Sequence, residues 1–476
     1  MTTEPSGTPG AKAESDSSVE VSLFEVHKKI QVRAVSGIFA TWRWILVWFT
    51  QLLFYGLPWL TWNGRQSVLF DLAQRKFYIF GMVFWPQDVF FLAVLLIISA
   101  FALFLFTAVG GRLWCGYACP QTVYTEIFLW IEQKIEGDRN ARMKLDAAPM
   151  SPRKAMLRGS RYAVWIAVAV WTGFTFVGYF TPIKVLWNEL MVFSFGPWET
   201  FWIIFYSAFT YVFAGHLREQ VCKYMCPYAR FQGVMFDPDT LVITYDEERG
   251  EPRGPRKKSL DYKAQGKGDC VDCEICVQVC PTGIDIRKGL QYECIGCAAC
   301  IDACDQVMDK MGYPKGLIRY STENAIAKHW GWKDILGHVV RPRVIIYTAI
   351  LSAVTLAWLW GLATKPVLRV DVIRDRATLA REVEGGLIEN LYRLQVMNVS
   401  ETAQRYSLSV VGLDKIEIAG EHTVEVPAAA NKEILVQVRV PPESGKTGAN
   451  VIHFDVKSLN DESVAVHEKA TFLMPR

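Results

Sequence analysis

Eight cysteines between residues 270 and 304 fall into two runs of the same spacing. The chain reads CVDCEICVQVCP and then CIGCAACIDACD, so the pattern CxxCxxCxxxC occurs twice. Three thiolates separated by two-residue gaps can surround one [4Fe–4S] cluster, and the fourth cysteine of the run then points to a neighbouring cluster. The spacing therefore predicts two clusters with crossed ligands, Cys270, Cys273, Cys276 and Cys304 on one, and Cys294, Cys297, Cys300 and Cys280 on the other.

The doubled spacing separates this prediction from other uses of cysteine. A single CxxC would equally suit zinc or a redox dithiol, but neither needs eight cysteines in this pattern. The stretch resembles a bacterial-type two-cluster ferredoxin. Pro281 closes the first run as that resemblance expects, and Asp305 stands where the second proline would be. An electron-relay role follows.

Four further cysteines form a second repeated motif. GRLWCGYACPQ contains Cys115 and Cys119, and REQVCKYMCPYARFQ contains Cys222 and Cys226, so CxxxCP occurs twice. Residues i and i+4 share a helix face, so each pair can present two sulfurs together. We expect a metal or redox role, because thiolates suit Cu(I), zinc or another iron–sulfur centre. The alternative is that they are small buried hydrophobic residues. His216 is a candidate extra ligand or proton carrier, or else a cap at a helix end.

The composition indicates that membrane helices position these motifs. Of 476 residues, 51% are hydrophobic, with 17 Trp, 18 Tyr and 27 Phe, which is unusually apolar for a soluble protein of this size. A helix needs about 20 residues to cross a bilayer. Five apolar segments approach or exceed that length, at 40–60, 88–109, 161–181, 197–215 and 343–363. We therefore expect a membrane α-helical protein with about five spans.

The distribution of Lys and Arg predicts the orientation. Both are frequent in the loops 110–160 and 216–342, whereas residues 182–196 carry only Lys184. Because basic loops stay on the cytoplasmic side, we expect the N-terminus and both cysteine runs to be cytoplasmic. An odd number of spans then places the C-terminal region in the periplasm of a bacterial inner membrane.

Sequence patterns divide the chain into five parts. Residues 1–37 are expected to form a disordered cytoplasmic tail, because the first twenty have little to bury. Residues 38–244 hold four spans and both CxxxCP motifs, residues 245–335 the inserted ferredoxin-like module, and residues 343–363 the fifth span. Residues 366–476 alternate apolar and polar residues in short stretches such as KEILVQVRV, which predicts an immunoglobulin-like all-β sandwich.

Together, the paired CxxxCP motifs, the ferredoxin module between the fourth and fifth spans and the outer β domain resemble the FixG/CcoG/RdxA family. Members of that family are membrane accessory proteins for assembly of cbb-type cytochrome c oxidases. The resemblance implies a metalloreductase that converts Cu(II) to Cu(I), with Cys115, Cys119, Cys222 and Cys226 as the catalytic copper site. It also implies a cytoplasmic electron donor, a copper chaperone or transporter and oxidase subunits as partners, with a homodimer as one compatible assembly.

Two other functions remain open at this point. The chain could be an electron conduit between a quinone pool and a partner enzyme, although no sequence feature marks a quinone pocket. It could also be a non-catalytic scaffold whose β domain docks the oxidase. No GxGxxG or Walker phosphate loop is present, and nothing in the sequence supports nucleic-acid binding.

Overall fold

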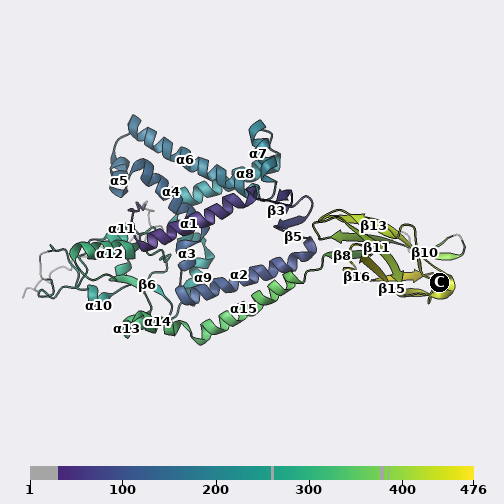
Figure 1. Ribbon diagram of the computed structural model, residues 1–476. Helices are drawn as coiled ribbons and strands as arrows, with labels where there is room; N and C mark the ends of the chain where they lie inside the picture. Colours follow the sequence, from purple (N-terminus) through teal and green to yellow (C-terminus); the bar gives the residue numbers. More distant parts are fainter. Residues whose placement is uncertain (1–29, 259–261, 376–379, 384, 462, 476) are drawn as a thin grey trace, which may run out of the picture.

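The computed structural model describes residues 30–258, 262–375, 380–383, 385–461 and 463–475. The cysteine-rich module lies at one end of an elongated molecule, long helices fill the middle, and a β-sandwich forms the other end (Figure 1). Most of the predicted 1–37 tail lies outside the described residues.

All five predicted spans contain helix. The long helices of the middle region are α1 Ile38–Gly56, α2 Val89–Gly110, α6 Pro152–Val177, α8 Pro197–Thr210 and α15 Pro342–Ala363. Among the described residues, four helices are long and apolar enough to cross a membrane: Pro86–Gly110, Pro152–Val177, Pro197–Leu217 and Pro342–Ala363. The helix α1, which contains Arg43, is not one of them, although it runs between the same two ends of the molecule (Figure 1). The membrane-helical fold is confirmed, and a fifth span stays a prediction.

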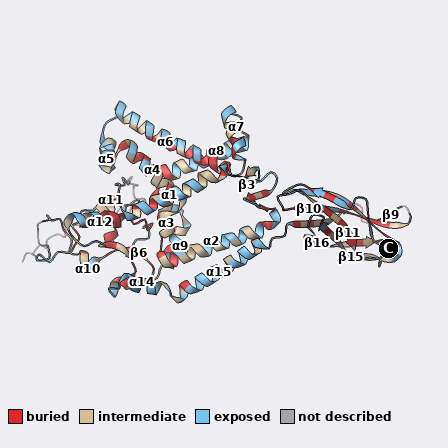
Figure 2. Cartoon of the chain, viewed as in Figure 1, coloured by how far each residue is buried: buried red, intermediate tan, exposed pale blue. Residues whose placement is uncertain are grey.

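The long helices pack in pairs, α2 with α15 and α6 with α8 (Figure 1). Close approach of the second pair depends on Gly173 of α6, because a Cβ there would lie 2.6 Å from the carbonyl oxygen of Ile203. Small residues serve membrane helices in this way. Away from these contacts, many residues of the helices are exposed, pale blue in Figure 2. Large apolar side chains such as those of Phe90, Leu96 and Trp360 are among them. Such faces suit contact with lipid.

The third predicted span begins earlier than expected. The sequence predicted a start near residue 161, but α6 begins at Pro152, where Ser151 Oγ accepts a hydrogen bond from Lys154 N. A serine cap followed by proline at the first helical position is a strong start signal. The apolar pattern misses it because the first two turns of α6 are polar and lie beyond the apolar segment.

Short helices surround the ends of the long ones. They are α3 Leu113–Tyr117, α4 Pro120–Glu136, α5 Arg139–Ala147, α7 Ile183–Val192, η3 Tyr211–Leu217, η4 Val221–Met225 and α9 Pro227–Met235. Both η3 and η4 are π-helical. Stretches of π-helix are rare and are often found at functional sites.

A segment with two small sheets, one of two strands and one of three, joins the helices to the β-sandwich. Its elements are η1 Leu57–Trp59, β1 Thr61–Trp62, β2 Arg65–Gln66, β3 Val68–Asp71, β4 Lys76–Ile79, β5 Met82–Phe84 and η2 Pro86–Asp88. Val83 packs with Met397 of the sandwich in one buried cluster. Buried Asp88 forms ion pairs with Lys365 and Arg369, each at 2.8 Å. These contacts attach the sandwich to the start of α2.

The cysteine-rich module contains short elements around its loops. They are β6 Val242–Tyr245, α10 Glu247–Gly250, α11 Ile275–Gln278, η5 Ile286–Lys288, α12 Ala299–Met311, β7 Ile318–Ser321, α13 Glu323–Ala327 and α14 Trp332–Val339. Residues 30–37, from the predicted tail, cross this module, and Arg33 N donates to the Gln278 carbonyl at 2.8 Å. Asp302 of α12 accepts hydrogen bonds from Phe39 N and Ala40 N at 3.3 and 2.7 Å. The module therefore caps the first long helix.

The C-terminal domain is a sandwich of two antiparallel sheets. One sheet has the strand order β12-β14-β10-β8, with β9 also paired to β10, and the other has the order β13-β11-β15-β16. The strands are β8 Leu368–Arg374, β9 Arg381–Val383, β10 Leu387–Asn398, β11 Gln404–Val411, β12 Glu417–Ala419, β13 Thr423–Val426, β14 Asn431–Val440, β15 Gly448–Ser458 and β16 Ala465–Met474, with η6 Pro442–Ser444 before β15. Alternate residues such as Tyr392, Phe454 and Phe472 are fully buried between the sheets. The predicted all-β sandwich is confirmed.

Candidate metal centres

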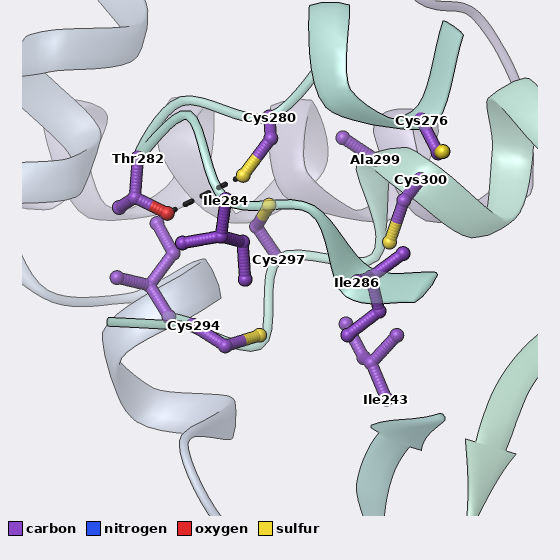
Figure 3. A pocket seen from close by; sticks show the side chains of 11 residues that line it. Ile243, Cys276, Cys280, Thr282, Ile284, Ile286, Cys294, Cys297, Ala299 and Cys300 are labelled. Atoms are coloured by element: carbon purple, nitrogen blue, oxygen red, sulfur yellow. Dashed lines mark hydrogen bonds between the residues drawn. The ribbon is translucent and has the colours of Figure 1, made fainter. Parts of the chain in front are cut away.

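Two neighbouring cavities in the module are lined by the cysteines of the two runs. Figure 3 shows the sulfurs of Cys280, Cys294, Cys297 and Cys300 around the first cavity, which Ile243, Ile284 and Ile286 also line. The second cavity is lined by Cys270, Cys273, Cys276 and Cys304. Cys276 also reaches the first cavity. The structure thus brings together the same two sets of four cysteines that the crossed spacing predicted.

Matching turns in the two runs direct the thiols into the cavities. In the first run, Asp272 and Glu274, on either side of Cys273, have positive φ angles of 53° and 55°. In the second run, Gly296 and Ala298 flank Cys297 with φ angles of 70° and 57°. Alternating right- and left-handed residues turn successive backbone N–H groups to one side, where they form a concavity that suits anionic iron–sulfur clusters. The two cysteine runs therefore share the same backbone turn as well as the same cysteine spacing.

The thiol sets and their surroundings fit two [4Fe–4S] clusters. With Cys276 counted in the second cavity, each cavity offers four thiols, and apolar side chains such as Ile286 and Leu317 keep water away. Among the described residues, no three His, Cys, Asp or Glu side chains stand close enough to hold a single metal ion. This holds for the cysteines of the two cavities and for the four cysteines of the CxxxCP motifs. A [4Fe–4S] cluster differs from a single ion in that each of its thiolates binds a different iron.

One cation lies beside the second cavity. The side chain of Arg287 is 6% exposed and forms ion pairs with Asp285 at 2.8 Å and Asp272 at 2.5 Å. Arg287 also lines the cavity that holds Cys276. A positive charge at this position favours an anionic or reduced group nearby, and charge and hydrogen bonding tune the potentials of such centres.

The two CxxxCP motifs adopt the same local structure. Cys115 lies in α3 and Cys222 in η4, while Cys119 and Cys226 have extended backbones immediately before the prolines that start α4 and α9. Proline restricts the preceding residue to extended conformations and suits the first position of a helix. Each motif therefore bends the chain at its second cysteine.

These four thiols, which we call the thiol group, lie within electrostatic reach of one another. Burial raises the pKa of Cys115 to about 12, and the charges of Cys119, Cys222 and Cys226 raise it while Arg112 lowers it. Burial likewise raises the pKa of Cys222 to about 11. The Cys115 thiol donates to Gln232 Oε1 at 3.4 Å. Because metals bind the thiolate, loading of the thiol group should release protons.

The thiol group packs directly against the first cavity. Cys115 and Cys222 contact the buried cluster that contains Cys297. The backbones touch at Gly116, where a Cβ would lie 2.8 Å from the carbonyl carbon of Gly296 and 2.9 Å from Cys297 Cα. Because Gly116 and Gly296 have no side chains, the first CxxxCP motif can approach the loop that carries Cys297. The sequence alone does not predict this contact.

Two tyrosines strengthen this contact. Tyr320 of β7 donates its hydroxyl hydrogen to the Gly296 carbonyl at 2.7 Å, and Tyr117 of α3 lies 3.4 Å from the same hydroxyl. Neither tyrosine was recognised as part of a site from the sequence, because they are 203 residues apart in the chain. Only the packing of β7 against α3 brings them together.

Buried charges near the thiol group were also missed. Fully buried Glu132 pairs with Arg142 at 2.8 Å and with Arg218 at 2.7 Å, and Glu136 pairs with Arg161 at 3.0 Å. Arg161 is 2% exposed, although it lies within a predicted span. Charged residues at such positions are costly and commonly functional, so their presence in an apolar segment was the available signal.

Comparison with protein families supports this organisation. The chain matches a 4Fe–4S binding domain over residues 92–137, a 4Fe–4S dicluster domain over residues 217–323, and the immunoglobulin-like fold at the C-terminus of FixG over residues 358–475. Each of the first two matches includes one CxxxCP motif, and the second also includes both cysteine runs. The module therefore belongs to an iron–sulfur protein, and the sandwich is immunoglobulin-like.

Three curated relatives align with most of the chain. The nitrogen fixation protein FixG of Rhizobium meliloti is 39% identical over 84% of this chain and 83% of its own length. Protein RdxA of Cereibacter sphaeroides is 37% identical over 93% of this chain and 95% of its own, and protein RdxB of that organism is 36% identical over 95% and 97%. The chain is a membrane-bound iron–sulfur electron-transfer protein, an oxidoreductase, and belongs to the FixG/RdxA family.

Proposed function

We propose that the protein reduces Cu(II) to Cu(I) at the thiol group and supplies the Cu(I) for assembly of the copper centre of a cbb-type cytochrome c oxidase. The observation that carries this proposal is the contact of Cys115 and Cys222 with the buried cluster around Cys297. A substrate metal held by these thiols would lie beside the iron–sulfur module. No intervening domain would be needed for electron transfer.

The chemistry of the residues supports a copper substrate. Thiolates are soft ligands that favour Cu(I) over Cu(II), so binding to Cys115, Cys119, Cys222 and Cys226 would help drive the reduction. When bound, the iron–sulfur clusters supply one-electron transfer, which matches the single electron that Cu(II) requires. The chain's own part is to hold the two cysteine sets and the thiol group together through Gly116 and Tyr320.

The proposed ligands follow the two cavities. Cys270, Cys273, Cys276 and Cys304 would hold one cluster, and Cys294, Cys297, Cys300 and Cys280 the other. We further propose that these cavities and the thiol group face the cytoplasm, with the sandwich in the periplasm, where it can contact oxidase subunits. This arrangement agrees with the basic loops, and the two regions lie at opposite ends of the long helices (Figure 1).

An anaerobic copper titration tests the proposal. Purified full-length protein is reduced with dithionite, freed of excess reductant and mixed with Cu(II), while absorbance and EPR report the oxidation state of the clusters. The comparison is a variant in which all four cysteines of the thiol group are replaced by serine. A Met225→Leu variant controls for the exposed thioether between Cys222 and Cys226.

The proposal requires Cu(II) to reoxidise the wild type and the Met225→Leu variant but not the serine variant. If all three proteins are reoxidised at the same rate, copper attacks the clusters without using the thiol group. The electron-conduit function, in which the thiols bind no copper, would then be preferred.

A further inference from the structure

A cavity of about 290 Å³ lies between α6 and η3, and Ile30 of the N-terminal segment also lines it. Its lining includes Arg161, Tyr162, Trp165, Gly215, His216 and Arg218. Three of these residues form an aromatic wall, since the ring centroid of His216 lies 6.4 Å from that of Tyr162 and 6.1 Å from that of Trp165. The volume and the aromatic lining suit a planar organic ring.

Two buried guanidinium groups give the cavity hydrogen-bond donors. Arg161 is 2% and Arg218 6% exposed. Each already pairs with a carboxylate, Glu136 at 3.0 Å and Glu132 at 2.7 Å. Even so, Arg161 Nε and Arg218 Nη1 have no hydrogen-bond partner among the described residues. Glu219, which is 8% exposed, also lines the cavity, so the lining carries a carboxylate as well as the two guanidinium groups.

The backbone and the depth of the cavity also point to a ligand. Gly215 and His216 belong to the π-helix η3, whose geometry widens the helix at this point. Arg161 and His216 both lie within helices long and apolar enough to span the membrane. Ionisable residues at such positions commonly mark pathways for substrates or protons. A ligand that enters from the bilayer could reach them.

The cavity is connected to the thiol group by short paths. Gln121, two residues after Cys119, donates from Nε2 to the carbonyl oxygens of Phe213 and Arg218 at 2.9 and 3.1 Å. His216 and Cys222 are six residues apart. Six residues span at most about 20 Å even when fully extended, so His216 lies within that distance of Cys222.

We infer that this cavity binds the ring of a membrane quinol, which donates the electrons for the reduction. The inference rests on the proposed function and deepens it, because it assigns the electron donor to the bilayer rather than to the cytoplasm. The His216 imidazole would form a hydrogen bond with a ring oxygen, Tyr162 would contact a face of the ring, and the buried guanidinium groups of Arg161 and Arg218 would keep the lining positively charged. Lipid phosphate fits less well, because both arginines are already paired with carboxylates.

The reaction balances with groups already named. One quinol loses two electrons and two protons and leaves as a quinone. The clusters that the two cysteine sets would hold could each accept one of these electrons, and two Cu(II) ions would be the final acceptors. The protons pass in turn to the exposed His216 imidazole and from it to water at the mouth of the cavity. No other oxidant or reductant is needed.

The test uses full-length protein in lipid nanodiscs with oxidised clusters and no copper. A short-chain ubiquinol is added anaerobically, and cluster reduction is followed by absorbance. His216→Gln should slow this reduction by about 100-fold, the usual effect of removing a general base. Tyr162→Leu should weaken binding of the quinol. In both variants, dithionite should still reduce the clusters, and Cu(II) should reoxidise them at the wild-type rate.

A control variant addresses a second aromatic cavity. This cavity, of about 590 Å³, lies at the β-domain end of α6 and α8 and is lined by Trp198, Trp202 and Tyr206. Trp198→Leu should leave the quinol-dependent reduction unchanged. A photoreactive azidoquinone provides a readout independent of activity, and it should label peptides that contain Tyr162 or His216.

Two results would overturn the inference. One is wild-type reduction by quinol in both His216→Gln and Tyr162→Leu. The other is azidoquinone labelling confined to the cavity around Trp198. Because the reoxidation by Cu(II) is measured separately after dithionite reduction, either result leaves the copper proposal standing. Conversely, normal quinol oxidation without any reoxidation by Cu(II) would contradict the copper proposal alone.

Discussion

Gly116→Ala tests whether the close contact between the thiol group and the module matters. A Cβ at this position would lie 2.8 Å from Gly296 C and 2.9 Å from Cys297 Cα, and backbone atoms cannot rotate out of the way. The two loops must separate by roughly 0.5 Å or more to restore ordinary contact, and overpacking of this kind costs about 1–3 kcal/mol. Alanine recovers up to about 1 kcal/mol through its higher helix propensity. From the middle of these two ranges, we expect a net loss of stability of about 1–2 kcal/mol.

The assay follows cluster absorbance during heating and the rate of reoxidation by Cu(II) at room temperature. The midpoint of cluster loss should fall by roughly 2–8 °C, since about 1 kcal/mol corresponds to 2–4 °C in a domain of 150–250 residues. Reoxidation should slow, because the thiol group moves away from Cys297. Gly233→Ala in α9 is the matched control, because a Cβ there meets no atom within 4 Å.

Gly116→Ala should lower the midpoint of cluster loss and slow reoxidation by Cu(II), whereas Gly233→Ala should change neither. If Gly116→Ala behaves like Gly233→Ala in both measurements, the close approach of the loops contributes nothing, and the argument that the module transfers electrons across this contact fails.

Three other changes test separate parts of the structure. Asp302→Ala removes the acceptor for Ala40 N, so it should cost about 1 kcal/mol and raise hydrogen exchange at the start of α1. Cys304→Ser should remove the cluster held with Cys270 and leave the other, as judged by iron content and EPR, if the ligands cross between runs. Glu389→Gln should destabilise the β-sandwich by about 1.5–3 kcal/mol at neutral pH, the value of hydrogen bonds to charged groups, as measured by hydrogen exchange of β10.

The last of these predictions depends on pH. Burial opposes ionisation of Glu389, but hydrogen bonds from Arg439 and Arg381 and their charges lower its pKa overall. A carboxyl with a lowered pKa in the folded state stabilises the protein above the pKa of the unfolded chain, about 4.3, and that contribution disappears as the pH falls through the lower folded value. The stabilities of the wild type and the Glu389→Gln variant should therefore begin to approach each other below about pH 4.3, the pKa of the unfolded chain, and should converge once the pH is below the lowered folded pKa. A difference that persists there would contradict the electrostatic explanation.

Asp302→Ala has a control in the same helix, and Cys304→Ser has an outcome that would contradict the crossed ligands. Asp309→Ala also removes a carboxylate from α12, but its ion pair with Lys315 is exposed, so exchange at α1 should not change. If Cys304→Ser removes the cluster held with Cys294 instead, each run binds its own cluster, and the crossed assignment is wrong.

Local spacing explains why much of the site could be predicted. A cubane constrains its ligands within a few residues, so the CxxCxxCxxxC runs alone predicted which cysteines share a cavity. The long apolar stretches predicted the helices because each helix forms its backbone hydrogen bonds within a single stretch of sequence. Alternating residues predicted the β-sandwich, and the structure confirms it.

Contacts between distant segments could not be predicted in this way. Gly116 and Gly296 are ordinary glycines in the sequence, and only the folded chain shows that their backbones touch. The π-helix η3 has no distinct apolar period, and the cap from Asp302 to α1 joins residues more than 260 positions apart. These features depend on how the helices and the module pack, which a single sequence does not specify.

X-ray absorption at the copper edge tests the central claim most directly. Dithionite-reduced protein, freed of excess reductant, is mixed anaerobically with one equivalent of Cu(II) and frozen, and the same is done with the variant that has serine at Cys115, Cys119, Cys222 and Cys226. The account predicts Cu(I) with sulfur ligands in the wild type and no sulfur-bound copper in the variant. Copper that remains Cu(II), or Cu(I) with the same ligands in both proteins, would contradict it.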